Sequence, residues 1–229
     1  MDDIAHYGAY LTEVKHASQN TVSSYLRDVT QFSEYLRSTQ QWDLRDADRE
    51  TIEAYMHWMQ GRGKSAASIT RFLASVKSFY NFLVANHDLR ANPAKGITAE
   101  KAERKYPEIL TSKEVELFLE QPQCVDAKGF RDHAMLELLY ATGIRVSELI
   151  SLNLDDFNAA GGFIRCENRG KERIIPLYHT AIKAIQDYVK NVRPQLIADS
   201  GEEALFVNMN GERMSRQGFW KIIKYYQEK

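Results

Sequence analysis

An arginine and a glutamate stand three residues apart, directly after a glycine that interrupts a helical pattern, in Ala141-Thr142-Gly143-Ile144-Arg145-Val146-Ser147-Glu148-Leu149. At that spacing the side chains of Arg145 and Glu148 share one face of a helix. A guanidinium fork matches two phosphate oxygens and can stabilise the charge of a phosphorane-like transition state, while a carboxylate beside it fixes its rotamer. From spacing alone, however, an exposed ion pair without function is the more frequent explanation.

Charge is distributed unevenly along the chain. The 229 residues carry a formal net charge of -1, which would argue against a nucleic-acid partner if the charges were spread evenly. Residues 61–105 nevertheless contain nine basic residues against three acidic ones, whereas the part of the chain before them leans acidic. Because phosphate binding needs a local excess of Lys and Arg, this stretch keeps a nucleic-acid partner open.

Cysteine usage and the N-terminus indicate the compartment. Cys124 and Cys166 match no metal-ligand spacing, so we expect buried free thiols in a reducing cytosol and no metal site. The acidic start of the chain is unlike a secretory signal, and no apolar run approaches the ~18 residues of a membrane span. The sequence therefore predicts a cytoplasmic protein without membrane association.

The first ninety residues show four helical patterns. The first covers residues 4–16, and the second follows Ser18 and Asn20, with Arg27 and Asp28 off its apolar stripe. Asp48 can cap a third helix that stops at Gly61 and Gly63. Ser65 opens a fourth, whose apolar side is wide enough for the centre of a small bundle, with Arg71 and Lys77 facing outward.

After a charged stretch that is typical of an exposed linker, a second domain begins with the capping box Thr111-Ser112-Lys113-Glu114. A helix over residues 130–141 precedes the glycine break, and a short helix resumes at Arg145. Residues 162–166 and 173–177 predict a hairpin around the turn Asn168-Arg169-Gly170-Lys171. A helix from about Thr180 that stops before Pro194, a strand over residues 205–207 and a last helix capped by Ser215 complete the pattern.

Three segments together resemble one family. The stretch from Phe130-Arg131-Asp132 through Leu149 closely resembles the first arginine box of Xer-type tyrosine recombinases, within the phage integrase family. Lys171-Glu172-Arg173-Ile174-Ile175-Pro176-Leu177 is similar to the family's lysine-bearing hairpin, and Asn20-Thr21-Val22-Ser23-Ser24-Tyr25-Leu26-Arg27-Asp28 to the helix entry of its core-binding domain. Given this resemblance, which covers essentially the whole chain, a functional Arg145 becomes the favoured interpretation.

The resemblance implies a reaction and a fold. A tyrosine would attack a DNA phosphodiester without metal or other cofactor, forming a 3′-phosphotyrosine and freeing a 5′-hydroxyl for a partner strand. Arg145 matches the first catalytic arginine and Glu148 the acidic residue that orients it. The implied fold is mainly α with a small β-hairpin: a SAM-like helical core-binding domain at 1–90, a linker at 91–107 and a partial catalytic domain at 108–229.

The general acid has two candidates. In the family a hairpin lysine protonates the leaving oxygen, but the turn of this sequence departs from the usual pattern. Arg169 occupies the lysine position if the turn is one residue shorter, although an arginine is a poor proton donor. Lys171 is the nearest lysine and is slightly favoured.

The family's later catalytic residues are not found in this sequence. Its His-x-x-Arg box, a further His or Trp and the nucleophilic tyrosine have no match, so we expect a chain without its nucleophile, truncated by design or naturally. Tyr225 and Tyr226 are expected to pack the last helix, and His133 and His179 to be scaffold residues. A chain without the C-terminal helix that docks on a neighbour in relatives is expected to be a monomer in solution.

The family grips duplex DNA between its two domains and assembles as a tetramer on it. The implied partners are therefore double-stranded DNA and other recombinase protomers. Candidate phosphate or groove contacts, which could equally be solvated caps and charges, are Asn20, Thr21, Arg27, Lys64, Ser65, Arg71 and Lys77.

Two alternatives remain beside a recombinase. The chain could occupy recombination sites as a DNA-binding protein without chemistry, or, less consistently with its basic stretch, be a helical interaction scaffold with no salt-dependent DNA affinity. The target site remains open, as does the choice between chromosome-dimer resolution and integration of a mobile element.

Overall fold

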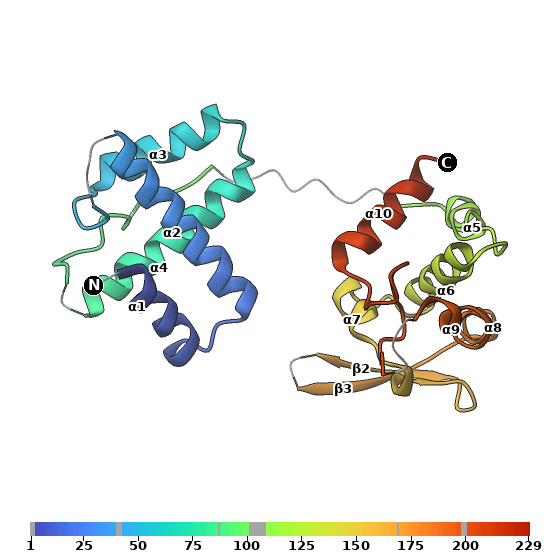
Figure 1. Ribbon diagram of the computed structural model, residues 1–229. Helices are drawn as coiled ribbons and strands as arrows, with labels where there is room; N and C mark the ends of the chain where they lie inside the picture. The colour runs from blue at the N-terminus through green and yellow to red at the C-terminus, as the bar shows by residue number, and fades with distance from the viewer. Residues whose placement is uncertain (1–2, 40–42, 87, 101–108, 169, 198–200) are drawn as a thin grey trace. The chain divides into compact units, whose positions relative to one another are not determined.

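The computed structural model describes residues 3–39, 43–86, 88–100, 109–168, 170–197 and 201–229. The chain divides into two compact units, Met1–Tyr106 and Pro107–Lys229, each with its own hydrophobic core (Figure 1). Both units are largely helical, and the described strands all belong to the second unit. No described helix is both long enough and apolar enough to cross a membrane.

The first unit is a helical bundle. Its helices are α1 (Asp3–Ala9), which continues as a π-helical turn at Tyr10–Val14, then α2 (Gln19–Thr39), α3 (Arg49–Gly61) and α4 (Ala66–Ala85). The predicted caps are confirmed for Asp48 and Ser65, whose side chains accept the backbone N–H groups of Thr51 and Ser68. The core is aromatic, because Phe32, Phe72 and Phe79 are buried on α2 and α4.

Two expectations about this unit are corrected. Asp28, predicted to lie off the apolar stripe of α2, is buried because Arg71 and Ser75 of α4 bind its carboxylate. The first part of the expected linker is not exposed, since Ala94 and Ile97 are buried in the core of the bundle. The later part of that linker, residues 101–107, lies outside the described residues.

The second unit begins with three helices in sequence. These are α5 (Ser112–Glu120), α6 (Ala127–Thr142) and α7 (Val146–Ser151). Thr111 and Glu114 form the predicted capping box. The α6 helix starts earlier than expected because Asp126 accepts the Gly129 N–H at 2.7 Å. Gly143 ends α6 in the left-handed conformation, with φ of 58°, which glycine adopts without a Cβ penalty.

A three-stranded antiparallel sheet follows in the order β1-β2-β3. The strands are β1 (Phe157–Asn158), β2 (Phe163–Asn168) and β3 (Lys171–Pro176), so the predicted hairpin is present and gains a short edge strand. In its register Asn168 pairs with Lys171 and Cys166 with Arg173. Cys166 is buried as expected, but Cys124, also a free thiol, is exposed.

The last part of the chain departs from the expected pattern in two places. The helix α8 (His179–Asp187) continues through a π-helical turn at Tyr188–Val192 into α9 (Arg193–Leu196), rather than stopping before Pro194. Proline is tolerated there because it occupies the first turn of α9, where its missing N–H is not needed.

Residues 205–207 do not form the predicted strand. The segment is buried and bonds to irregular backbone on both sides, from the Leu205 N–H to the Leu152 carbonyl and from the Met214 N–H to the Phe206 carbonyl. Only single bridges result, such as Val207 with Arg213. The predicted cap Ser215 then starts α10 (Arg216–Gln227), which lies beside α7 (Figure 1).

Candidate active site

The site is built around the break between α6 and α7. Because Gly143 turns the chain and Ile144 is buried, Arg145 is held at the start of α7 in an extended conformation. Its side chain is 69% exposed. The guanidinium therefore lies at the surface of the unit, where an anion can reach it.

Glu148 lies beneath Arg145. Its side chain is only 5% exposed. The Arg145 backbone N–H donates to Oε2 of Glu148 at 2.8 Å, and Nη1 of Arg145 lies 3.4 Å from Oε1. The predicted pairing of the two residues is thus present, but the contact between their side chains is long.

The shorter side-chain contacts to Glu148 come from Arg173, a residue that sequence reasoning did not single out. Its Nη1 and Nη2 donate to Oε1 and Oε2 of Glu148 at 3.1 and 3.0 Å. This is the two-point geometry in which arginine binds carboxylates most strongly. Arg173 stood in the hairpin motif, but nothing local in the sequence indicated a partner 25 residues away.

The hairpin places Lys171 on the same face of the sheet as Arg173, because alternate residues of a strand point to the same side. Lys171 is exposed at the start of β3. Gly170, with φ of 73°, supplies the turn. The other candidate for the general acid, Arg169, lies outside the described residues.

A pocket joins the start of α7 to the start of α10. It is lined by Arg145, Val146 and Ser147 from α7, and by Arg216, Gln217, Phe219 and Trp220 from α10. Trp220 is 60% exposed. The pocket thus combines apolar walls with two guanidinium groups, and Arg216 was not singled out from the sequence because its motif lies in another helix.

Other chemically capable side chains of this unit are committed to packing. Tyr226 is buried, and its hydroxyl donates to Oδ2 of Asp132 at 3.1 Å. Burial and the neighbouring Asp132 raise the pKa of the Tyr226 hydroxyl above its usual range. Nζ of Lys128 lies 4.3 Å from the ring centroid of the more exposed Tyr225. His133 and His179 lie on α6 and α8.

The candidate DNA contacts of the first unit fall into two groups. Asn20 and Arg27 are exposed on α2, Thr21 is half-buried near its start, and Ser65 caps α4. Arg71, in contrast, donates Nε and Nη2 to the two carboxylate oxygens of Asp28, both at 3.0 Å. Nζ of Lys77 donates to the Ile97 carbonyl at 2.6 Å.

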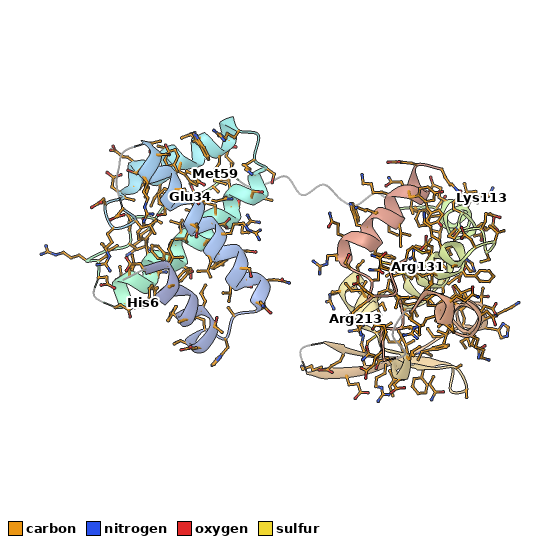
Figure 2. The ribbon with its side chains drawn as sticks, viewed as in Figure 1. His6, Glu34, Met59, Lys113, Arg131 and Arg213 are labelled. Atoms are coloured by element: carbon orange, nitrogen blue, oxygen red, sulfur yellow. The ribbon has the colours of Figure 1, made fainter. Side chains whose placement is uncertain are left out.

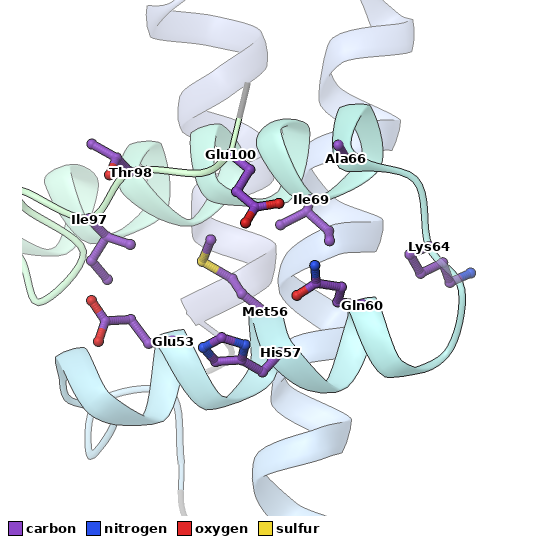
Figure 3. Close-up of a pocket in the computed structure, with 10 residues that line it drawn as sticks. All are labelled: Glu53, Met56, His57, Gln60, Lys64, Ala66, Ile69, Ile97, Thr98 and Glu100. Atoms are coloured by element: carbon purple, nitrogen blue, oxygen red, sulfur yellow. The ribbon is translucent and has the colours of Figure 1, made fainter. Parts of the chain in front are cut away.

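A cavity lies between α3, α4 and the segment that follows them (Figure 3). Met56 and Ile69 supply apolar lining, and Glu53, His57 and Glu100 supply polar lining. Lys64, at its edge, points away from the other lining residues (Figure 3). Among the described residues, no group of three or more His, Cys, Asp and Glu side chains could hold a metal ion.

Residues 108–229 match the phage integrase family, and residues 4–87 match the phage integrase N-terminal SAM-like domain. Over 229 aligned residues the chain is 41% identical to the tyrosine recombinase XerD of Oceanobacillus iheyensis, covering 98% of this chain and 75% of that protein. The chain belongs to the phage integrase family of tyrosine recombinases. XerD of Staphylococcus epidermidis is 39% identical, with 97% of this chain and 76% of the relative covered.

Solved structures of this family share the fold. The Tn1549 transposon integrase in complex with transposon right end DNA matches 100% of this chain and 79% of that chain, with a TM-score of 0.74 and 19% identity. A lambda integrase dimer bound to a core site matches 99% of this chain and 76% of that chain, with a TM-score of 0.73 and 17% identity. The tyrosine recombinase fold therefore extends over both units.

Proposed function

We propose that this chain binds duplex DNA at recombination sites and holds one backbone phosphate on Arg145, the phosphate-activating part of a site-specific tyrosine recombinase. The observation that carries the proposal is the arrangement of Arg145 over Glu148. An exposed guanidinium stands above a carboxylate that is buried and already bound by Arg173. Such a fork is available to two phosphate oxygens and to the charge that develops during strand cleavage.

Lys171 is the proposed proton donor to the leaving 5′-oxygen. Its support is the register of the hairpin, which sets Lys171 on the sheet face that also carries Arg173 toward Glu148. A lysine can release its proton to the leaving group, whereas an arginine stays protonated. Lys171 is therefore preferred to Arg169 for this role.

Contacts to the DNA backbone come from both units in this proposal. In the second unit Arg216 and Trp220 extend the surface around Arg145. In the first unit, Asn20, Thr21, Arg27, Lys64 and Ser65 are the proposed contacts, while the fork of Arg71 is occupied by Asp28. Other recombinase protomers on the same DNA are the proposed protein partners, by analogy with the lambda integrase tetramer bound to a Holliday junction.

We further propose that no tyrosine of residues 1–229 is the nucleophile. Tyr226 has its hydroxyl bonded to Asp132 inside the core. Tyr225 stands nine residues after Arg216, which at 1.5 Å per residue is roughly 14 Å along α10 from the pocket that Arg145 lines. DNA binding without strand cleavage is the activity expected of this chain alone.

Incubation with a nicked duplex that traps covalent intermediates tests the proposal. We expect salt-dependent binding of the duplex by the chain and no covalent protein–DNA adduct on a denaturing gel. Fusion to the C-terminal segment of a curated relative should restore the adduct, and Arg145→Ala should then abolish it, whereas Arg165→Ala on the other face of the hairpin should not. An adduct mapped to Tyr225 or Tyr226, or binding without salt dependence, would contradict the proposal.

A further inference from the structure

Glu148 lies between two arginines that come from different elements of the fold. Arg173 reaches it from β3 with both terminal nitrogens, at 3.1 and 3.0 Å. The side chain of Arg145 reaches it with one nitrogen, at 3.4 Å. The carboxylate is thus held mainly by the arginine that is distant in sequence.

The charges of this cluster depend on Arg173. Two guanidiniums and one carboxylate leave one net positive charge, and the more exposed guanidinium is that of Arg145, at 69% against 44% for Arg173. Without Arg173, a buried carboxylate would lose its strongest partner, which is strongly unfavourable. The nearest group able to replace that partner is the fork of Arg145, three residues away.

We propose that Arg173 is a positioning residue, which binds the Glu148 carboxylate and so keeps the fork of Arg145 free for a DNA phosphate. The same bridge fastens the hairpin that carries Lys171 to the helix that follows Arg145. The inference rests on the proposed function of Arg145 as a phosphate ligand. It adds a residue from a different motif, whose effect on DNA is exerted through Glu148.

The hairpin offers a matched control for Arg173. Arg165 lies on the neighbouring strand, is exposed to a similar extent, 47%, and also contacts carboxylates, those of Asp156 and Glu172. It pairs with Ile174 rather than Arg173, which places it on the opposite face of the sheet. Arg165→Met therefore removes the same charge from the same hairpin without touching Glu148.

The test measures the affinity of the chain for a fluorescein-labelled duplex, selected from a random pool by binding to this chain, over a series of salt concentrations. The slope of log affinity against log salt falls by about 0.9 for each phosphate that the protein no longer neutralises. We expect Arg145→Ala and Arg173→Met each to lower the slope by about that amount. Arg165→Met should leave the slope at the wild-type value.

A rescue variant separates positioning from direct contact. Arg173→Met combined with Glu148→Gln removes the buried charge that would capture Arg145, so the slope should return to the wild-type value although Arg173 is still absent. A purely structural loss would lower the folded fraction, which circular dichroism detects, without changing the slope. Should Arg173→Met not fold, Arg173→Lys, which keeps the charge but not the planar fork, is expected to lower the slope part-way.

The outcomes distinguish the inference from the proposed function. An unchanged slope for Arg145→Ala would overturn the role of Arg145 itself. A lowered slope for Arg145→Ala with an unchanged slope for Arg173→Met, or for Arg173→Lys in its place, would overturn only the positioning role. Failure of the Glu148→Gln rescue would also overturn it, since Arg173 would then contact phosphate directly.

Discussion

Two arginine clusters, one in each unit, use the same parts differently. In the first unit Arg71 binds the buried carboxylate of Asp28 with two nitrogens, both at 3.0 Å. In the second unit the buried carboxylate of Glu148 is bound in the same way by Arg173, and Arg145 stands beside the pair. Arg71 therefore corresponds to Arg173 and not to Arg145.

The difference shows how an arginine becomes available to a ligand. Arg71 is 48% exposed, yet the two nitrogens that a phosphate would use face Asp28. In the second cluster an additional guanidinium satisfies the carboxylate, so the fork of Arg145 is not consumed. Exposure alone does not separate the two arginines, whereas the partner of each fork does. Figure 2 draws the side chains of both units, with Arg131 among the helices of the second.

The largest expected effect would test Arg71 as a structural residue. Arg71→Met leaves Asp28 buried without its charged partner, which should lower the free energy of unfolding of the first unit by about 3–5 kcal/mol. The slope of DNA affinity against salt should remain at the wild-type value. Urea unfolding followed by circular dichroism, together with the salt series, measures both quantities.

Arg27→Met is the matched control for Arg71→Met, because Arg27 is exposed on the helix that carries Asp28. It should change the stability by less than about 0.5 kcal/mol and lower the salt slope. The comparison between the clusters breaks if Arg71→Met lowers the slope while the stability is unchanged.

A third buried carboxylate, Asp132, sharpens the comparison because Tyr226 shares it with Arg131. Tyr226→Phe should cost about 1.5–3 kcal/mol at neutral pH, the usual contribution of a hydrogen bond to a charged group. Tyr225→Phe, in the neighbouring exposed ring, should cost almost nothing. Thermal unfolding of both variants at several pH values is the measurement.

The pH dependence of this loss has a definite sign. Burial raises the pKa of Asp132 in the folded protein, and Arg131 and the Tyr226 hydroxyl oppose that rise. A carboxyl with a raised pKa favours folding most in acid, so its contribution declines as pH rises from the unfolded pKa through the folded pKa. Tyr226→Phe removes a group that stabilises the charged form, so its cost should be larger at pH 7 than near pH 4. An equal cost at both pH values would contradict this account.

The smallest expected effect concerns a carboxylate with no arginine beside it. Asp48 caps α3 by accepting the Thr51 N–H at 2.9 Å and the Thr51 hydroxyl at 2.6 Å, and these bonds lower the pKa of Asp48. Asp48→Ala should cost about 1 kcal/mol at neutral pH. Because the pKa is lowered on folding, the cost should vanish as pH falls through that pKa. A loss as large as that of Arg71→Met would show that the arginine adds little to a buried carboxylate.

The local structure of this protein was largely determined by its sequence. Apolar spacing predicted the helices of the first unit, and the caps Asp48, Ser65, Thr111 and Ser215 form the predicted bonds. These bonds join groups only three residues apart, so the sequence around each cap contains both partners. The break at Gly143 and the pairing of Arg145 with Glu148 were predictable for the same reason.

Only the tertiary structure decided which partner each long-range group would find. Nothing near Asp28 indicates Arg71, nothing near Glu148 indicates Arg173, and residues 205–207 gave no sign that irregular backbone would replace a strand partner. A guanidinium on a long side chain can reach several carboxylates, and packing between distant elements selects one of them. That selection leaves Arg145 exposed with its fork unoccupied, whereas the local sequence showed only an arginine beside a glutamate.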